Sequence, residues 1–136
     1  MKQPTRQHWN NDALTPPRTT AAACLELAAT CRLLARECRP PIGGARFAAR
    51  DPECPDTYLA NPIGPLLDET RPSRLISVDR HGIHRDAQDP APDSGALAIV
   101  LAALQAKPDA AAAALPSSTD GCVIASLEVG LLPITQ

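Results

Sequence analysis

Aromatic residues are scarce in this chain, at 2% of its 136 residues. Because an aromatic ring buries far more surface than an alanine methyl group, alanine and leucine must supply most of the core, which should be thin for its size. The hydrophobic fraction of 44% is still enough for one core, and the length fits a single domain. The aromatic side chains are Trp9, Phe47 and Tyr58.

Strong charge and long apolar runs are also missing. The net charge is −2, with neither a basic face nor interleaved aromatic residues, so nucleic acid is not an expected partner. No stretch approaches the roughly 18 consecutive apolar residues of a membrane span, so no membrane partner is expected. Residues 1–17 are polar and lack the apolar core of a secretory signal. They predict a flexible N-terminal arm and a cytoplasmic protein.

The five cysteines do not indicate a disulfide framework, because their number is odd and no secretory signal is evident. Cys24, Cys31 and Cys38 are seven residues apart, which places them on one stripe of a helix. Seven residues rise about 10 Å, too far for a disulfide or a shared zinc ion. We therefore expect buried filler residues. The acids around Cys54 oppose an activated thiolate there.

Hydrophobic periodicity and turn residues predict a mixed α/β fold. The segment 110–115 is alanine-rich and fits helix or strand, and its position after a Pro-Asp turn favours a strand. Helix 95–107 is apolar nearly all round, so we expect it to be buried on several sides. The other predicted elements are helices at 21–37 (capped by Thr19 or Thr20) and 121–127, strands at 45–50, 57–60 and 75–78, and turns at 51–56, 61–64 and 79–82.

Two imidazoles lie three residues apart in the predicted hairpin turn, at His81 and His84. With Asp79 or Asp86 they could hold a metal ion. The alternative is a solvated turn with two exposed, titratable side chains.

The other polar motifs have structural explanations. Ser117, Ser118 and Asp120 have no histidine nearby in the sequence, so they are better helix caps than members of a Ser-His-Asp site. Arg46 follows two glycines and could bind an anion, although such an arginine is more often a surface residue.

Five motifs in order resemble the class II aldolase/adducin family over residues 22–136. They are Ala49–Tyr58 (ARDPECPDTY), Asn61–Gly64 (NPIG), Leu75–Gly82 (LISVDRHG), Lys107–Asp109 (KPD) and Leu131–Gln136 (LLPITQ). The resemblance implies an α/β/α sandwich around a central, mainly antiparallel sheet. It also implies that residues 18–136 form a partial domain truncated at the C-terminus, because the family continues beyond the last motif.

The family resemblance implies a metal site whose donors are not retained. Family enzymes use zinc or another divalent metal to stabilise an enediolate. Their His-x-His ligand pair falls here on Leu115 and Ser117, and their acid/base glutamate falls on Ala96. Their third histidine would lie past Gln136. Since an aliphatic side chain cannot bind zinc, we expect no bound cofactor and no catalytic residue.

The family's substrate-contacting positions fall on Arg46 and Ala48, and the NPIG motif places Asn61 and Gly64 in a substrate loop. For Asn61 and Gly64 we favour a purely structural role, a tight turn.

Two functions follow from this pattern. One is a catalytically inactive domain, either a retained pseudoenzyme or a decaying copy, that acts through protein contacts. The other is a metal-dependent aldolase or epimerase acting on a small hydroxy-carbonyl or sugar-phosphate substrate. It would take its ligands from His81 and His84 or from a neighbouring subunit. An unfinished sheet would expose Leu131, Leu132 and Ile134, so we expect self-association or a partner subunit.

Overall fold

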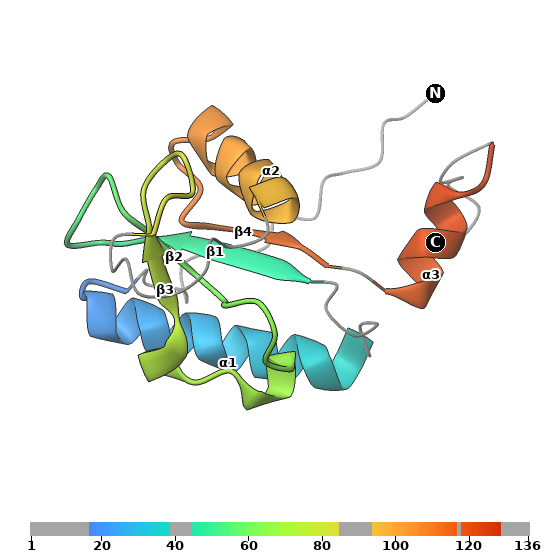
Figure 1. The fold of residues 1–136 in the computed structure, drawn as a ribbon, viewed down its shortest axis with the longest axis horizontal. Coiled ribbons are helices and arrows are strands. Elements are labelled where there is room, and N and C mark those ends of the chain that lie inside the picture. Colours follow the sequence, from blue (N-terminus) through green and yellow to red (C-terminus); the bar gives the residue numbers. More distant parts are fainter. Residues whose placement is uncertain (1–16, 39–44, 85–93, 117, 129–136) are drawn as a thin grey trace, which may run out of the picture.

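The computed structural model describes residues 17–38, 45–84, 94–116 and 118–128. The predictions for the N-terminal arm (1–16), for the glycines before Arg46 and for the segment 131–136 lie outside these residues. Figure 1 shows a sheet with one long helix on each face. The elements are α1 (Thr20–Cys38), β1 (Arg46–Arg50), β2 (Tyr58–Ala60), β3 (Ile76–Val78), α2 (Ser94–Ala106), β4 (Ala112–Leu115) and α3 (Thr119–Ala125), with 3-10 turns η2 (Leu67–Glu69) and η3 (Pro72–Arg74).

The sheet has the strand order β3-β2-β1-β4, and every neighbouring pair is antiparallel. Arg50 at the end of β1 pairs with Tyr58, and Arg46 at its start pairs with Leu115 of β4. This confirms the predicted strands, including the alanine-rich one, and the antiparallel sheet between two helical layers. None of the helices in the described ranges is long and apolar enough to cross a membrane.

Each face of the sheet has its own apolar cluster. Side chains alternate along β1, so Phe47 faces α1 while Ala48 faces α2. The α1 cluster contains Ala23, Leu27, Cys31, Ala45, Phe47 and Leu59. The α2 cluster contains Ala48, Tyr58, Ala60, Val78, Leu97, Val100, Leu101 and Leu104. Small residues on the strands let both helices approach the sheet closely.

Helix α1 begins as predicted, because the Thr19 hydroxyl accepts a hydrogen bond from the Ala22 N–H at 3.2 Å. Its buried stripe includes Cys31, which is fully buried among apolar side chains. Burial raises the pKa of the Cys31 thiol to about 11. Cys31 is therefore a filler, as the spacing predicted. The Cys38 side chain lies outside what the structure describes.

Helix α2 is buried on one face only, so the prediction of burial on several sides was wrong. Leu97, Val100 and Leu104 turn toward the sheet, whereas Ile99 is 58% exposed. Among the described residues, the sheet packs against one face of this helix and the 79–84 hairpin lies beside it, while the opposite face is exposed (Figure 1). Apolar composition alone does not reveal how many neighbours a helix has.

The acidic turn after β1 holds the start of α1. The Glu53 carboxylate accepts the Thr20 N–H at 2.7 Å, and the Asp51 carboxylate accepts the Thr20 hydroxyl. A carboxylate at a helix N-terminus stabilises the orphan N–H groups there. The hydrogen bonds from the Thr20 backbone and side chain hold the pKa of Glu53 below its ordinary value.

Arg50 joins β1 to the end of α2 and to the turn that follows it. Its Nη2 donates to the Leu104 carbonyl at 2.6 Å and its Nε to the Ala110 carbonyl at 3.0 Å. The guanidinium also lies over the Tyr58 ring, 5.6 Å from the centroid. The Leu104 carbonyl belongs to the last turn of α2, so Arg50 supplies a C-terminal cap from outside the helix.

The capping role of Glu53 makes stability depend on pH. A carboxylate with a lowered folded-state pKa stabilises the fold above its unfolded pKa, about 4.3, and this contribution is lost as the pH falls through the folded value. We expect Glu53→Gln to flatten the acid limb of the thermal unfolding midpoint, followed by circular dichroism. The control Asp56→Asn removes an exposed carboxylate of the same turn and should keep the parent's profile. Identical profiles for Glu53→Gln and the parent would contradict the capping role.

Candidate functional site

The positions at which the resemblance places chemistry lie along one edge of the sheet, where β1 begins and where β2 and β4 end. Strand β1 is antiparallel to both neighbours, so its first residue, Arg46, lies beside the ends of β2 and β4, next to Asn61 and Leu115. Arg50 holds the last turn of α2 at the opposite end of β1. The first turn of α2, with Ala96, therefore points back toward Arg46. The structure thus brings together Arg46, Asn61 and Leu115, and Ala96 lies at the end of α2 away from the turn that Arg50 holds.

Asn61 is fully committed to the backbone of β1. Its Oδ1 accepts the Phe47 N–H at 2.9 Å and its Nδ2 donates to the Ala45 carbonyl at 3.2 Å. The side chain is 4% exposed, so the amide extends the β1–β2 ladder from a buried position. Gly64 has a φ of 101°, which a tight turn requires and other residues rarely adopt. These contacts give Asn61 a positioning role at the edge that carries Arg46.

Arg46 is 6% exposed and has interaction partners of its own, so the expectation of a surface arginine was wrong. The register places it on the same face as Leu115 and Ala48, beneath α2. Sequence position alone could not show this burial. It follows from β1 being a central strand with neighbours on both sides.

The residues at the family's metal positions do not fit a metal. Leu115 is half-buried and packs against the apolar cluster beneath α2, and Ala96 is a half-buried methyl group in the first turn of α2. Zinc takes thiolate, imidazole or carboxylate ligands, which these two side chains lack. Within the described ranges, no three His, Cys, Asp or Glu side chains gather as a metal-binding group. Ser117, the remaining ligand position, is outside those ranges.

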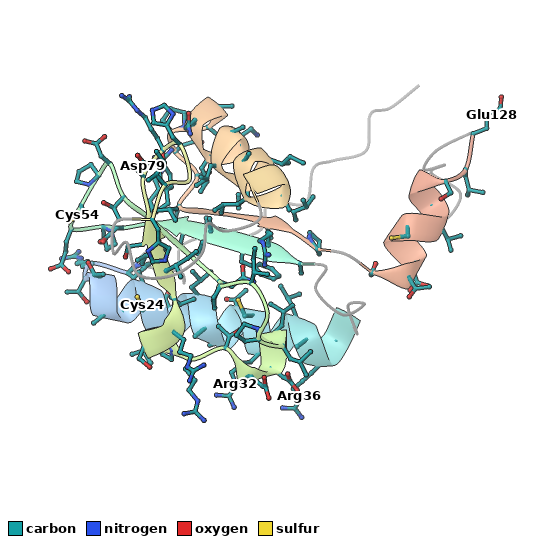
Figure 2. The ribbon with its side chains drawn as sticks, viewed as in Figure 1. Cys24, Arg32, Arg36, Cys54, Asp79 and Glu128 are labelled. Atoms are coloured by element: carbon teal, nitrogen blue, oxygen red, sulfur yellow. The ribbon has the colours of Figure 1, made fainter. Side chains whose placement is uncertain are left out.

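The hairpin at 79–84 forms as predicted, but it does not assemble a ligand set. The Asp79 carboxylate accepts the His81 N–H at 2.8 Å and the Ile83 N–H at 2.9 Å. Both hydrogen bonds lower the pKa of Asp79, and the one from Ile83 has the larger effect. Figure 2 shows Asp79 in this loop beside α2. His81 is exposed, while His84 is half-buried. The expectation of two exposed imidazoles was therefore wrong for His84.

The hairpin glycine has a specific structural reason. Gly82 has a φ of 78°, and a Cβ there would lie 3.7 Å from the side chains of Leu97 and Leu101. The positive φ of the turn is therefore what favours glycine, because a Cβ would make only ordinary contact with α2. Both ring nitrogens of His84 are buried, without a hydrogen-bond partner among the described atoms.

The remaining candidates keep structural roles or stay open to solvent. The Ser118 hydroxyl accepts the Gly121 N–H at 3.0 Å and caps α3, as predicted. Cys54 lies exposed at the outer tip of the acidic turn (Figure 2). The sequence analysis missed Arg50, which lies at one end of the central strand. A signal was available, because an arginine ends the strand just before an Asp-Pro turn.

Comparisons with known proteins agree with this geometry. The model of the Class II Aldolase and Adducin N-terminal domain matches residues 25–136. A crystal structure of an aldolase II superfamily protein from Pseudomonas syringae is similar at 28% identity and a TM-score of 0.76, covering 92% of this chain and 49% of that one. The L-fuculose 1-phosphate aldolase from Glaciozyma antarctica PI12 has 25% identity and a TM-score of 0.73, covering 82% and 49%.

A third structure shows the same fold at lower identity. YgbL from Klebsiella pneumoniae, a putative aldolase/epimerase/decarboxylase, has 20% identity and a TM-score of 0.69, covering 86% of this chain and 54% of its own. Among curated proteins, none matches this sequence. The chain therefore spans about half the length of the solved structures it resembles.

The buried amide of Asn61 makes a testable contribution to stability. Asn61→Ala leaves the Phe47 N–H and the Ala45 carbonyl without their partner, and each orphaned buried group costs roughly 1–3 kcal/mol. We expect the free energy of unfolding in urea to fall by about 2–4 kcal/mol. Ile63→Ala, a truncation at a 45% exposed position in the same turn, is the control and should change stability little. Equal effects of the two variants would contradict the positioning role.

Proposed function

Because this chain belongs to the Class II Aldolase and Adducin N-terminal domain family, we propose that it is a catalytically inactive form of that domain that acts through protein contacts. One observation carries the proposal. The ligand and acid/base positions at the edge of the sheet hold the aliphatic side chains of Leu115 and Ala96, and Leu115 packs into the cluster beneath α2. A position that could hold a metal ligand contributes to the core instead.

The residues that shape this edge are retained although the donors are absent. Asn61 still secures β1, Arg50 still caps α2, and Asp79 still closes the hairpin. Each of these contacts stabilises the fold without taking part in chemistry. This distribution supports a domain kept for its shape, whether it is a retained pseudoenzyme or a decaying copy.

Exposed apolar side chains support contacts with other chains. Leu25 and Leu33 on α1 are 62% and 60% exposed, and Ile99 on α2 is 58% exposed. Val123 and Leu127, near the end of the chain, are 56% and 50% exposed. Contact with another copy or with a partner subunit would cover these side chains, and this is what supports the proposed association.

The alternative is a metal-dependent lyase of the aldolase or epimerase type acting on a small hydroxy-carbonyl or sugar phosphate. The observation that favours it is the unpartnered imidazole of His84, three residues after His81. Asp79 offers little to such a site, because its carboxylate already accepts two backbone N–H groups. Any further ligand would have to come from outside the described residues or from a neighbouring subunit.

Metal content separates these two functions. We expect the purified, untagged protein to retain far less than one equivalent of zinc, manganese or iron after dialysis, measured by elemental mass spectrometry, because Leu115, Ser117 and Ala96 offer no imidazole, thiolate or carboxylate. Retro-aldol turnover with added zinc should stay at the level of the buffer. About one tightly bound metal per chain, lost in His81→Ala/His84→Ala, would overturn the proposal in favour of the alternative.

Association is tested by light scattering across protein concentrations. We expect a molar mass above the 14.3 kDa of one chain that rises with concentration. Because the exposed side chains are apolar, adding salt should not reverse it, since salt screens only charges. A mass of one chain at every concentration would exclude self-association and leave a different partner subunit as the contact.

A further inference from the structure

An apolar groove with a volume of about 470 Å³ lies on the α1 face of the sheet, between α1 and β4, which is an edge strand of the described sheet. This volume is in the range of binding pockets. Its wall is the side of α1 that carries Ala23 and Leu27, and its floor is formed by Phe47, Ala112 and Ala114. Figure 1 shows α1 on one side of the sheet and β4 above β1 in that view.

The groove is open because α1 covers β1 and β2 but not β4. The register places Ala112 and Ala114 on the same face as Ala49 and Phe47. Phe47 is 2% exposed, whereas Ala112 and Ala114 are exposed. Strand β4 carries no charge and no proline, which are the usual protections of an edge strand. The strand is also short, with four residues, and a segment lying over Ala112 and Ala114 would cover the apolar surface that they expose.

The chain itself leads into this groove. Pro17, the first described residue, is one of the residues that line it. We propose that residues 1–16 of this chain dock in the groove and place Trp9 and Leu14 over Ala112 and Ala114. This inference does not depend on whether the domain is catalytic.

The reach of the arm fits the length of the groove. Pro17 follows Trp9 by eight positions, and an extended chain spans about 3.3 Å per position, or about 26 Å. The floor from Ala110 to Ala114 extends over about 14 Å. Trp9 can therefore reach any point of the floor, and Leu14 can reach the end nearest Pro17.

The charges of residues 1–16 and those at the rim of the groove are complementary. Residues 1–16 carry Lys2 and Arg6 against one acid, Asp12. The groove has two acids at its lining, Glu26 and Asp109. The guanidinium of Arg50, which also lines it, is bonded to backbone carbonyls. An arm with net positive charge thus meets a rim on which the free charges are negative.

Tethering favours the chain's own arm over other occupants. A segment joined to the rim by a short linker has an effective concentration in the millimolar range. A second copy at micromolar concentration offers the same segment roughly a thousandfold more dilute. The arm of the same chain therefore occupies the groove first.

Trp9 is the chain's only tryptophan, so its fluorescence reports the position of the arm directly in the full-length protein. We expect emission at shorter wavelength, and slower quenching by acrylamide, in the native protein than in urea. Ala114→Glu puts a charge on the floor and should return both values toward those of the unfolded chain. Ala102→Glu adds the same charge at an exposed position of α2 and serves as the matched control. Far-UV circular dichroism checks that both variants fold.

Any other outcome overturns the proposal that residues 1–16 dock in the groove of their own chain. If Trp9 is quenched equally in the native and unfolded protein, the arm is free, as the sequence alone predicts. If Trp9 is protected but Ala114→Glu has no effect in a folded variant, the arm docks elsewhere. Protection that appears only as the protein concentration rises would assign the groove to the arm of a second copy.

If Ala114→Glu unfolds the strand, a second variant tests the proposal. Ala112→Gln places a polar amide on the same floor and should still lengthen the emission wavelength of Trp9. An unchanged wavelength overturns the proposal.

Discussion

The rest of this structure depends on the contacts of one arginine at the end of the central strand. Arg50 bonds the last turn of α2 and the turn that follows, so it fixes where β4 begins relative to β1. The register that results places Leu115 opposite Arg46 at the far end. A guanidinium suits this position because its planar set of donors can satisfy two carbonyls at once while its face rests on Tyr58. The contacts of Arg50 at the end of β1 thus set how Arg46 and Leu115 are placed at its start, where the family's chemical positions lie.

Asn61 completes the arrangement from the other end of β1. The amide replaces backbone partners where the β1–β2 ladder stops, and it does so from a buried position. Between these two anchors, β1 and β4 carry five alanines, which let helices pack closely on the sheet. Such a core gains little from each side chain, so satisfied polar groups at the strand ends matter more here than in an aromatic-rich core.

The sequence was informative where local chemistry decides the structure. The caps at Thr19 and Ser118, the alternating strands and the Asp-to-Gly hairpin all depend on residues a few positions apart. The fold family was evident from motifs over residues 22–136, close to the matched range of 25–136. The errors concern tertiary surroundings. The exposed side of α2, the burial of Arg46 and the half-buried ring of His84 depend on which elements lie next to each other, and periodicity carries no such information.

The separation of the scaffold from the family's donor positions means that the proposed loss of chemistry would leave the fold intact. The contacts that hold β1, α2 and the hairpin involve Arg50, Asn61 and Asp79, none of which stands at a metal or acid/base position. A polar ligand at position 115 would have to be desolvated beside the apolar cluster, and leucine removes that cost while adding buried surface. Functional sites commonly carry such a stability penalty. Leucine at position 115 is therefore neutral or favourable for folding, and only a requirement for catalysis would oppose it.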